Sequence, residues 1–316
     1  MLKTAICDLF GIEHPIIQGG MAHLGTAELA SAVSNAGGLG IIGSGYYEPD
    51  WVRQQIHLTR QQTSQPFGVN IPLTSPFVEQ IVEVVLKEKV SVVATGAGNP
   101  ESYIPRLKQT GIKVMPVVGS VALAKRLERA GADAIVAEGT ESGGHVGETT
   151  TMVLVPQVVD GVRIPVVAAG GIGDGRGLAA ALALGAQGIQ MGTRFVCSTE
   201  CVAHPRYKQK LLEAHDRSTV VTRQVLGLPQ RSLQNKLTDQ FQALEKAGAS
   251  KEELELFDRG RMYLGLIEGD IKEGSLLAGQ IAGLIKEIKP VRVIIEEIVD
   301  EAETIIASLK NFYRED

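Results

Sequence analysis

The segment Pro165-Val166-Val167-Ala168-Ala169-Gly170-Gly171-Ile172 determines the fold that the sequence predicts. Its first half is short, apolar and rich in β-branched residues, which is typical of a strand buried on both faces of a parallel sheet. The two glycines that follow indicate a tight turn at the end of that strand. Similar apolar runs recur roughly 20–30 residues apart, as strands that alternate with helices do. They cover residues 15–18, 39–43, 67–71, 90–95, 113–118, 134–137 and 188–192.

Helical patterns lie between these apolar runs, at residues 26–36, 76–89, 120–130 and 175–184 among others. Eight strand–helix units within about 200 residues predict an α/β protein with a (β/α)8 TIM barrel. An open doubly wound sheet is the alternative. It does not require eight near-equal units, and the first turn lacks the G-x-G-x-x-G fingerprint of that fold.

The pattern changes after Phe195. Residues 200–272 contain no comparable apolar run and are rich in Arg, Gln, Lys and Glu. We expect a mainly helical lid there, inserted into a barrel domain of residues 1–199 and 273–316. Its candidate helices cover residues 204–214, 231–247, 251–256 and 262–268. Residues 275–285 predict a helix of small and apolar residues, and residues 291–311 predict a final amphipathic helix with a solvated acidic face.

The composition limits the class of protein. The 316 residues carry a net charge of −5, and only 4% of them are aromatic, so nucleic-acid binding is not expected. The sequence has neither a signal-peptide pattern nor an apolar run of about 18–20 residues, so we expect a cytoplasmic protein without a membrane span. The three cysteines are too few for a disulfide framework. Cys197, Cys201 and His204 have the spacing of metal ligands, but no fourth ligand follows, and we predict no metal site.

Residues at the carboxyl ends of barrel strands form the active site in this fold. Here they are mostly glycines and neutral amides, with no lysine for Schiff-base chemistry and no set of three metal ligands. The ends of the last two strands, Ala169-Gly170-Gly171 and Gly192-Thr193, offer clustered backbone N–H groups where barrels bind phosphate. A phosphate beside a flat ring that small residues accommodate suggests FMN. Tight turns without a ligand are the alternative.

The sixth strand leads into Ala137-Glu138-Gly139-Thr140-Glu141-Ser142-Gly143-Gly144-His145-Val146-Gly147. The glycines let a flat ligand approach the backbone, and histidine is the side chain best suited to proton chemistry near neutral pH. This loop therefore predicts an imidazole beside the ligand, with His145 as the catalytic candidate. A flexible turn with a solvated histidine is the alternative.

Together these motifs resemble the nitronate monooxygenase superfamily of FMN barrels. The sequences that carry the resemblance lie at residues 17–22, 68–71, 95–100, 137–145, 168–172 and 192–195. Within the superfamily, Thr150-Thr151-Met152 and the segments 203–208 and 274–283 are more similar to the flavin-dependent enoyl-acyl-carrier-protein reductases, the enoyl reductase II family. The resemblance extends from the N-terminus to about residue 285.

The resemblance implies bound FMN, NADH or NADPH as co-substrate, and hydride transfer to the β-carbon of a trans-2-enoyl thioester on acyl carrier protein. By resemblance His145 assists, either through a hydrogen bond to the thioester carbonyl or by supplying the α-proton. The cofactor-binding residues carried over are Gly20, Met21, Ala22, Asn70, Glu138, Gly144, Ala169, Gly170, Gly171, Gly192, Thr193 and Gln280.

Further expectations concern partners. A monovalent cation is an additional candidate cofactor, and the family implies a homodimer. Arg206, Lys208 and Lys210 on the lid are candidates for docking the acidic carrier protein. The rival functions are an FMN-dependent nitronate monooxygenase and a flavin-binding protein without catalysis.

Overall fold

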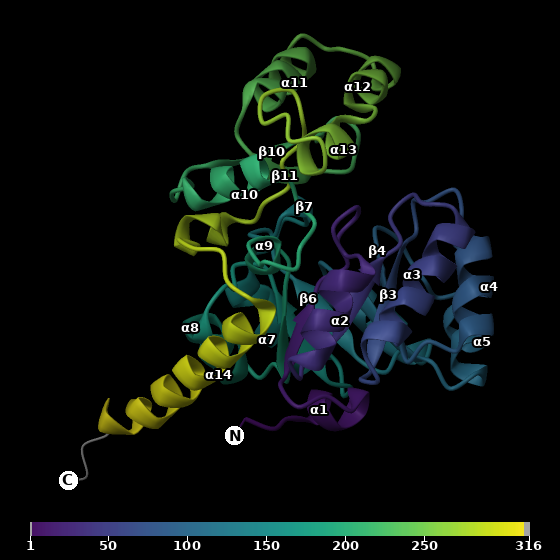
Figure 1. Cartoon of the computed structure of the whole chain (residues 1–316), viewed down its shortest axis with the longest axis vertical. Helices are drawn as coiled ribbons and strands as arrows, with labels where there is room; N and C mark the ends of the chain where they lie inside the picture. The colour runs from purple at the N-terminus through teal and green to yellow at the C-terminus, as the bar shows by residue number, and fades with distance from the viewer. Residues whose placement is uncertain (1, 313–316) are drawn as a thin grey trace.

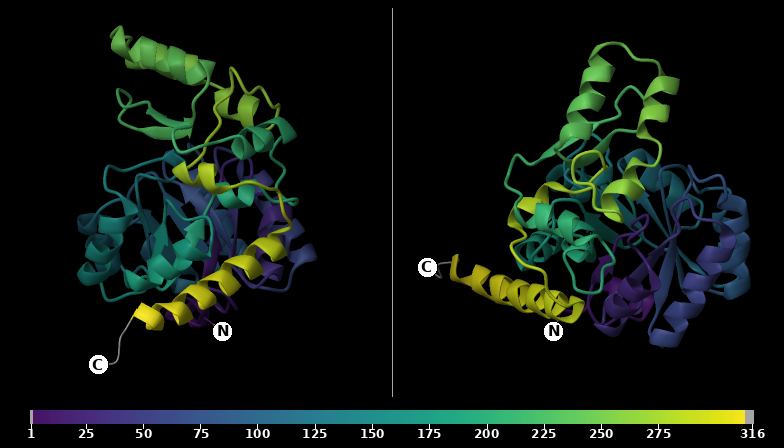
Figure 2. Two further views of the ribbon diagram at one scale, coloured as in Figure 1. Left: turned by 90° about the vertical axis from the view of Figure 1, so that its left-hand side faces the viewer. Right: turned by 45° about the horizontal axis from the view of Figure 1, so that its top comes forward.

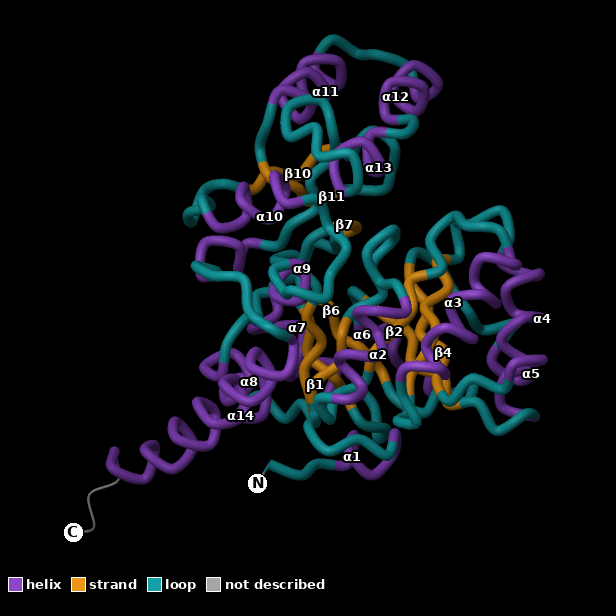
Figure 3. Tube along the Cα trace, in the orientation of Figure 1, coloured by secondary structure: helices purple, strands orange, loops and turns teal. Residues whose placement is uncertain are grey.

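Eight parallel strands form the centre of the protein, seen in a computed structural model that describes residues 2–312 (Figure 3). Neighbouring strands follow the order β1-β9-β8-β6-β5-β4-β3-β2. Their bounds are β1 (Ile16–Gln18), β2 (Gly40–Gly43), β3 (Phe67–Pro72), β4 (Val92–Gly96), β5 (Lys113–Val118), β6 (Ile135–Glu138), β8 (Val166–Ala169) and β9 (Gly188–Met191). Each lies within two residues of a predicted run.

The first and last strands of this order meet and close the ring. Ile17 bridges Leu39 in parallel, and the backbone N–H of Gln18 donates to the Leu39 carbonyl at 3.0 Å. The Gln18 carboxamide extends this seam, because its Nε2 donates to the Ile41 carbonyl and its Oε1 accepts from the Ile41 N–H, both at 3.0 Å. The predicted TIM barrel is therefore confirmed.

Helices surround the barrel and cover its outer face (Figure 1). They are α2 (Ala27–Asn35), α3 (Pro49–Gln62), α4 (Val78–Glu88), α5 (Ile104–Gln109), α6 (Val121–Arg129), α7 (Thr151–Gly161) and α8 (Gly175–Ala183). The short helix α1 (Ala5–Phe10) closes the end of the barrel at which the strands begin. Its Ile6 and Phe10 belong to the same buried cluster as the interior residues Ile17, Met115 and Val167. The barrel interior is thus a packed core, and the opposite end is left for a site.

Residues 200–272, predicted as an inserted lid and called the lid below, lie over the carboxyl ends of the strands (Figure 2). After the short α9 (Thr193–Val196), its helices are α10 (Pro205–Leu212), α11 (Lys236–Lys246), α12 (Lys251–Asp258) and α13 (Arg261–Leu266). The lid also contains a hairpin that the sequence reading missed, formed by β10 (Thr219–Thr222) and β11 (Gln230–Leu233). The helix predicted from residue 231 was therefore wrong at its start, because those residues pair as a strand.

The chain returns from the lid to the barrel through residues 275–285, where the predicted helix was also wrong. Leu277 forms an antiparallel bridge with Ser232, and only the short 3₁₀ helix η1 (Gln280–Leu284) follows. A Cβ at Gly279 would lie 2.8 Å from the Glu141 carbonyl, so the backbones approach too closely for an ordinary helix surface.

The final helix, α14 (Val291–Ser308), packs along α8, and η2 (Leu309–Phe312) ends the described chain. The sequence pattern predicts Ile294, Ile298 and Leu309 on the apolar side of this helix. Ile294 and Ile298 are buried, together with Ile295, whereas Leu309 is exposed. Among the described helices, none combines the length and apolar character that crossing a membrane requires.

Candidate functional site

A cavity of about 430 Å³ lies at the carboxyl ends of the barrel strands, between the barrel and the lid. Its volume is in the range of small-molecule and cofactor sites. All residues predicted for the site line it except Gln280. The predicted residues in its wall are Gly20, Met21, Ala22, Asn70, Glu138, Gly144, His145, Ala169, Gly170, Gly171, Gly192 and Thr193.

The barrel side of the cavity is built from backbone and small side chains. Gly170 and Gly171 follow β8 with φ angles of 89° and 70°, a left-handed conformation that favours glycine. Gly170, Gly171 and Gly192 all line the cavity, so backbone groups from the ends of β8 and β9 lie at its wall. The N–H groups at these strand ends could bind a phosphate, as the sequence predicts.

Close backbone contacts also shape the opposite wall. The loop after β1 lies directly against Asn70 of β3. A Cβ at Gly20 would overlap the side chain of Asn70, so only glycine fits at this position. Met21 and Ala22 therefore line the cavity next to Asn70. No charged side chain comes from this wall, so an uncharged flat ring could lie against it.

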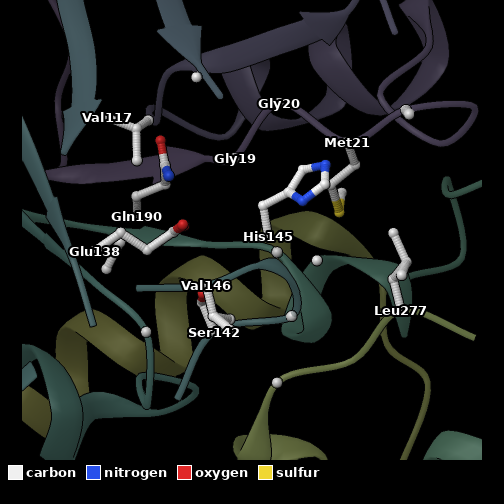
Figure 4. Close-up of a pocket in the computed structure, with 18 of the residues that line it drawn as sticks. Gly19, Gly20, Met21, Val117, Glu138, Ser142, His145, Val146, Gln190 and Leu277 are labelled. Carbon is white, nitrogen blue, oxygen red and sulfur yellow. The ribbon is translucent and has the colours of Figure 1, made fainter. Parts of the chain in front are cut away.

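His145 lies on β7 (Gly144–His145), a two-residue strand where the sequence predicted a loop. This strand pairs antiparallel with β11 of the lid, so that His145 lies opposite Gln230 and Gly144 lies opposite Arg231. The next residue, Val146, donates its N–H to the Pro229 carbonyl at 3.0 Å. The lid hairpin therefore holds the histidine in position, and Figure 4 shows the imidazole among the side chains that line the cavity.

Two effects govern the charge of this histidine. Burial lowers the pKa of His145, and the nearby positive charge of Arg223 lowers it further. The Leu228 and Pro229 carbonyls and Asp258 act in the opposite direction but more weakly than burial. His145 is therefore neutral at pH 7, with one N–H to donate and one nitrogen lone pair to accept a proton.

Glu138 and Gln190 occupy another part of the cavity (Figure 4). Glu138 is the last residue of β6, and Gln190 is the last but one of β9. Each is paired with Ala169 of β8, the strand that lies between them. Burial raises the pKa of Glu138 to about 7, while Ser142 opposes the shift. A carboxyl group near its midpoint at pH 7 can accept or donate a hydrogen bond to a ligand.

The loop between β6 and β7 is fixed at its base by α7. The backbone N–H of Thr151 donates to both carboxylate oxygens of Glu141, at 3.0 and 2.9 Å, and its hydroxyl donates at 2.9 Å. On the other side, Arg231 of β11 donates from Nε to the Thr140 carbonyl at 3.0 Å. The loop that carries His145 is thus fixed to both the barrel and the lid.

Three predictions about individual side chains need correction. Gln280 is exposed and does not line the cavity, because residues 275–285 are not the helix that would have directed it inward. Gln18, one of the neutral amides expected at the strand ends, does not face a ligand either, since its carboxamide closes the barrel seam. Lys208 is only 7% exposed and donates from Nζ to the carbonyls of Ser198 (2.6 Å) and Cys201 (2.7 Å), so it is not a surface docking residue.

The sequence reading missed two glutamines that line the cavity, Gln190 and Gln230. Gln190 had a readable signal, because it is a polar residue within an otherwise apolar strand. Gln230 had none, since it lies in the polar lid and faces the cavity only through the pairing of β11 with β7.

The cysteine and histidine cluster has structural explanations. Cys197 and Cys201 are buried free thiols. Burial raises the pKa of Cys197 to about 11 and also raises that of Cys201, so neither thiol is reactive near pH 7. The Nδ1 atom of His204 caps α10 by accepting from the Arg206 N–H at 3.1 Å.

Two solved structures of known proteins are similar to this chain over nearly its whole length. FabK from Thermotoga maritima is 52% identical, with a TM-score of 0.97 over 99% of this chain and 100% of that one. Nitroalkane oxidase from Streptomyces ansochromogenes is 30% identical, with a TM-score of 0.85 over 97% of this chain and 100% of that one.

Sequence relatives extend the comparison. A (3aS,4S,5R,7aS)-5-hydroxy-7a-methyl-1-oxo-octahydro-1H-indene-4-carboxyl-CoA dehydrogenase from Mycobacterium tuberculosis is 35% identical, over 96% of this chain and 97% of that protein. A probable nitronate monooxygenase from Staphylococcus saprophyticus is 38% identical, over 74% of this chain and 79% of that protein. These relatives are named as oxidoreductases. The profile of the family described as nitronate monooxygenase matches residues 3–80 and 73–301. The chain therefore belongs to the nitronate monooxygenase family.

Proposed function

We propose that this protein is an FMN-dependent enoyl-thioester reductase that uses NADH or NADPH and acts on trans-2-enoyl groups carried by acyl carrier protein. The observation that carries the proposal is the 52% identity to FabK over essentially the whole of both chains. The flavin-dependent enoyl reductases that the sequence resembles include FabK. The Mycobacterium tuberculosis relative is named for a CoA thioester, which supports the thioester class of substrate.

The cavity fits the proposed cofactor. Backbone N–H groups at Gly170, Gly171 and Gly192, with the Thr193 hydroxyl, would hold the phosphate. Asn70 and Glu138 would bind polar groups of the ring and its side chain, and the small residues at 20–22, 144 and 169 would leave room for the flat ring. FMN, when bound, would supply the hydride transfer between nicotinamide and thioester.

His145 would assist this reaction as a neutral group. A neutral imidazole is a good hydrogen-bond donor but a weak acid, so its N–H is better suited to the thioester carbonyl than to protonating the α-carbon. Of the two roles expected from sequence, the lowered pKa of His145 favours the hydrogen bond.

A nitronate monooxygenase is the second candidate function, because the family profile and the Staphylococcus saprophyticus relative carry that name. A neutral His145 would then act as a base on an acidic C–H group.

The experiment that distinguishes the two functions is anaerobic stopped-flow with the purified flavoprotein. Fast flavin reduction by NADH or NADPH, followed by reoxidation with a crotonyl thioester, supports the reductase. Reduction by a nitronate and not by a nicotinamide would establish the rival.

Docking of the carrier protein and dimer formation are part of the same proposal. With Lys208 buried, Arg206 and Lys210 remain as the exposed basic candidates on α10, although Lys210 also pairs with Glu213 at 2.8 Å. A monovalent cation that assists turnover is a further element, tested by comparing activity in potassium, sodium and tetramethylammonium salts.

A further inference from the structure

Gln230 of the lid faces the cavity next to His145. The two residues lie directly opposite each other in the antiparallel pairing of β11 with β7. Residues paired in this way project to the same face of a sheet, with Cβ atoms about 4.5–5.5 Å apart. Both side chains line the cavity, so the lid sheet presents an amide and an imidazole side by side.

The side-chain amide of Gln230 makes no hydrogen bond to a residue that the structure describes. The residue is 4% exposed and its Oε1 atom is fully buried without a partner, whereas its donor Nε2 is neither hydrogen-bonded nor fully buried. The Nδ1 atom of His145 is also buried and makes no hydrogen bond of normal geometry. A buried amide without a partner costs roughly 1–3 kcal/mol, and such groups call for an explanation. By contrast, Gln234 in the same lid donates to Asp239 at 3.0 Å.

The backbone of Gln230 is held on both sides, and the nearby arginines have other partners. Its strand is paired with β10 on one side and with β7 on the other. The two nearby arginines are already engaged, Arg223 with Asp258 and Arg231 with the Thr140 carbonyl and the Thr219 hydroxyl. The amide is therefore held toward the cavity with its hydrogen-bonding capacity unused, as expected of a ligand-binding group.

We propose that Gln230 and His145 together bind the carbonyl oxygen of the thioester substrate, with Gln230 contributing an amide N–H from the lid. This assignment rests on the proposed function. When hydride adds to the β-carbon, the electron pair of the C=C bond moves toward the carbonyl oxygen, and a proton then adds at the α-carbon. Two donors at that oxygen stabilise the charge that develops there.

The test is the substitution Gln230→Met, which keeps the length of the side chain and removes its hydrogen bonds. We expect reoxidation of the reduced flavin by crotonyl thioester to slow by about 10-fold, the loss of one hydrogen bond of about 1.4 kcal/mol. Reduction of the flavin by NADH or NADPH should stay within 2-fold of wild type, because no thioester carbonyl binds in that step. Gln224→Met, an exposed glutamine in the same hairpin, is the matched control.

A second measurement makes the result independent of turnover. Calorimetry should show that wild-type protein binds the saturated butyryl thioester about 10-fold more tightly than the thioether without the carbonyl, and that Gln230→Met loses this preference. If Gln230→Met does not retain flavin, Gln230→Asn withdraws the amide by one methylene and should show the same two effects.

The outcomes separate the two proposals. Wild-type protein that does not use the crotonyl thioester would overturn the proposed function and this assignment with it. Wild-type activity accompanied by unchanged reoxidation and unchanged carbonyl preference in the Gln230 variants would overturn the assignment alone.

Discussion

The two sides of the cavity are built in different ways. The barrel side offers glycines and backbone N–H groups at Gly170, Gly171 and Gly192, together with the Glu138 carboxyl group. The lid side, formed by β7 and the lid strand β11, offers the polar side chains of His145 and Gln230. The barrel side can hold a phosphate and a flat ring whatever reaction follows. The lid side would contact the reacting group of a substrate. This division explains how proteins named for different oxidations and reductions can share one fold, because the lid can change while the barrel rim is kept.

The largest expected effect comes from removing the imidazole. His145→Ala should lower kcat with the enoyl thioester by about 10²–10⁴-fold, the usual contribution of a positioned proton donor or acceptor. Flavin content should stay near wild type, because the barrel side is untouched. Steady-state kinetics and the flavin absorbance spectrum measure the two quantities. An unchanged kcat would remove His145 from the mechanism, and loss of the flavin would mean that the two sides are not independent.

Glu138 predicts a pH dependence of stability. Its pKa in the folded protein is about 7, above the ordinary value of 4.5, so the folded state binds more protons than the unfolded state between these pH values. Stability should therefore fall as pH rises from 5 to 8, by up to roughly 3 kcal/mol, since one pKa unit is about 1.4 kcal/mol.

Urea unfolding of the flavin-free protein at several pH values measures this slope. Glu138→Gln should flatten the profile, whereas Glu148→Gln, at an exposed carboxylate between β7 and α7, is the control. A Glu138→Gln profile as steep as that of wild type would show that other groups cause the dependence.

Arg231 tests whether the lid positions the histidine. It is 7% exposed and joins the Thr140 carbonyl to the Thr219 hydroxyl, at 3.0 and 3.1 Å. Hydrogen bonds of a charged group contribute about 1.5–3 kcal/mol, so Arg231→Met should lower kcat by about 10–100-fold with a smaller change in KM. Arg231→Lys should recover part of this loss. Arg217→Met, at an exposed arginine of the lid, is the control and should leave kcat and KM unchanged. If Arg231→Met had the same kcat and KM as wild type, this contact of the lid would not be needed to position His145.

The smallest effect is expected at an aromatic contact between barrel and lid. Tyr263 of α13 lies edge-on to His23, with ring centroids 5.5 Å apart, and the Nδ1 of His23 is 2.7 Å from the Tyr47 hydroxyl. Such a ring pair contributes about 1 kcal/mol, so Tyr263→Ala should raise KM roughly 5-fold and speed hydrogen exchange in α13. Tyr263→Phe keeps the ring and should behave as wild type. A Tyr263→Ala variant with unchanged KM and exchange would show that this contact does not hold the lid.

Most of the barrel could be read from the sequence, and the lid could not. Runs such as Val166–Ala169 are apolar throughout because both faces of the strand are buried, so their pattern is visible locally. Thr219–Thr222 and Gln230–Leu233 have no such pattern. They are short and mixed in polarity, and β11 finds part of its pairing at β7, far away along the chain. No local rule predicts a strand as short as Gly144–His145.

The same contrast holds within the candidate site. The order of the barrel strands, the glycines at their ends and the histidine loop were fixed by local sequence, because each strand end carries its own residues to the rim. Tertiary structure decided which glutamine faces the cavity, because that depends on how the lid sheet forms. Gln230 is turned inward by pairing with His145, whereas Gln280 is left outside by an extended segment that replaced a helix. The burial that sets the pKa values of Glu138 and His145 likewise arises only when distant segments enclose them.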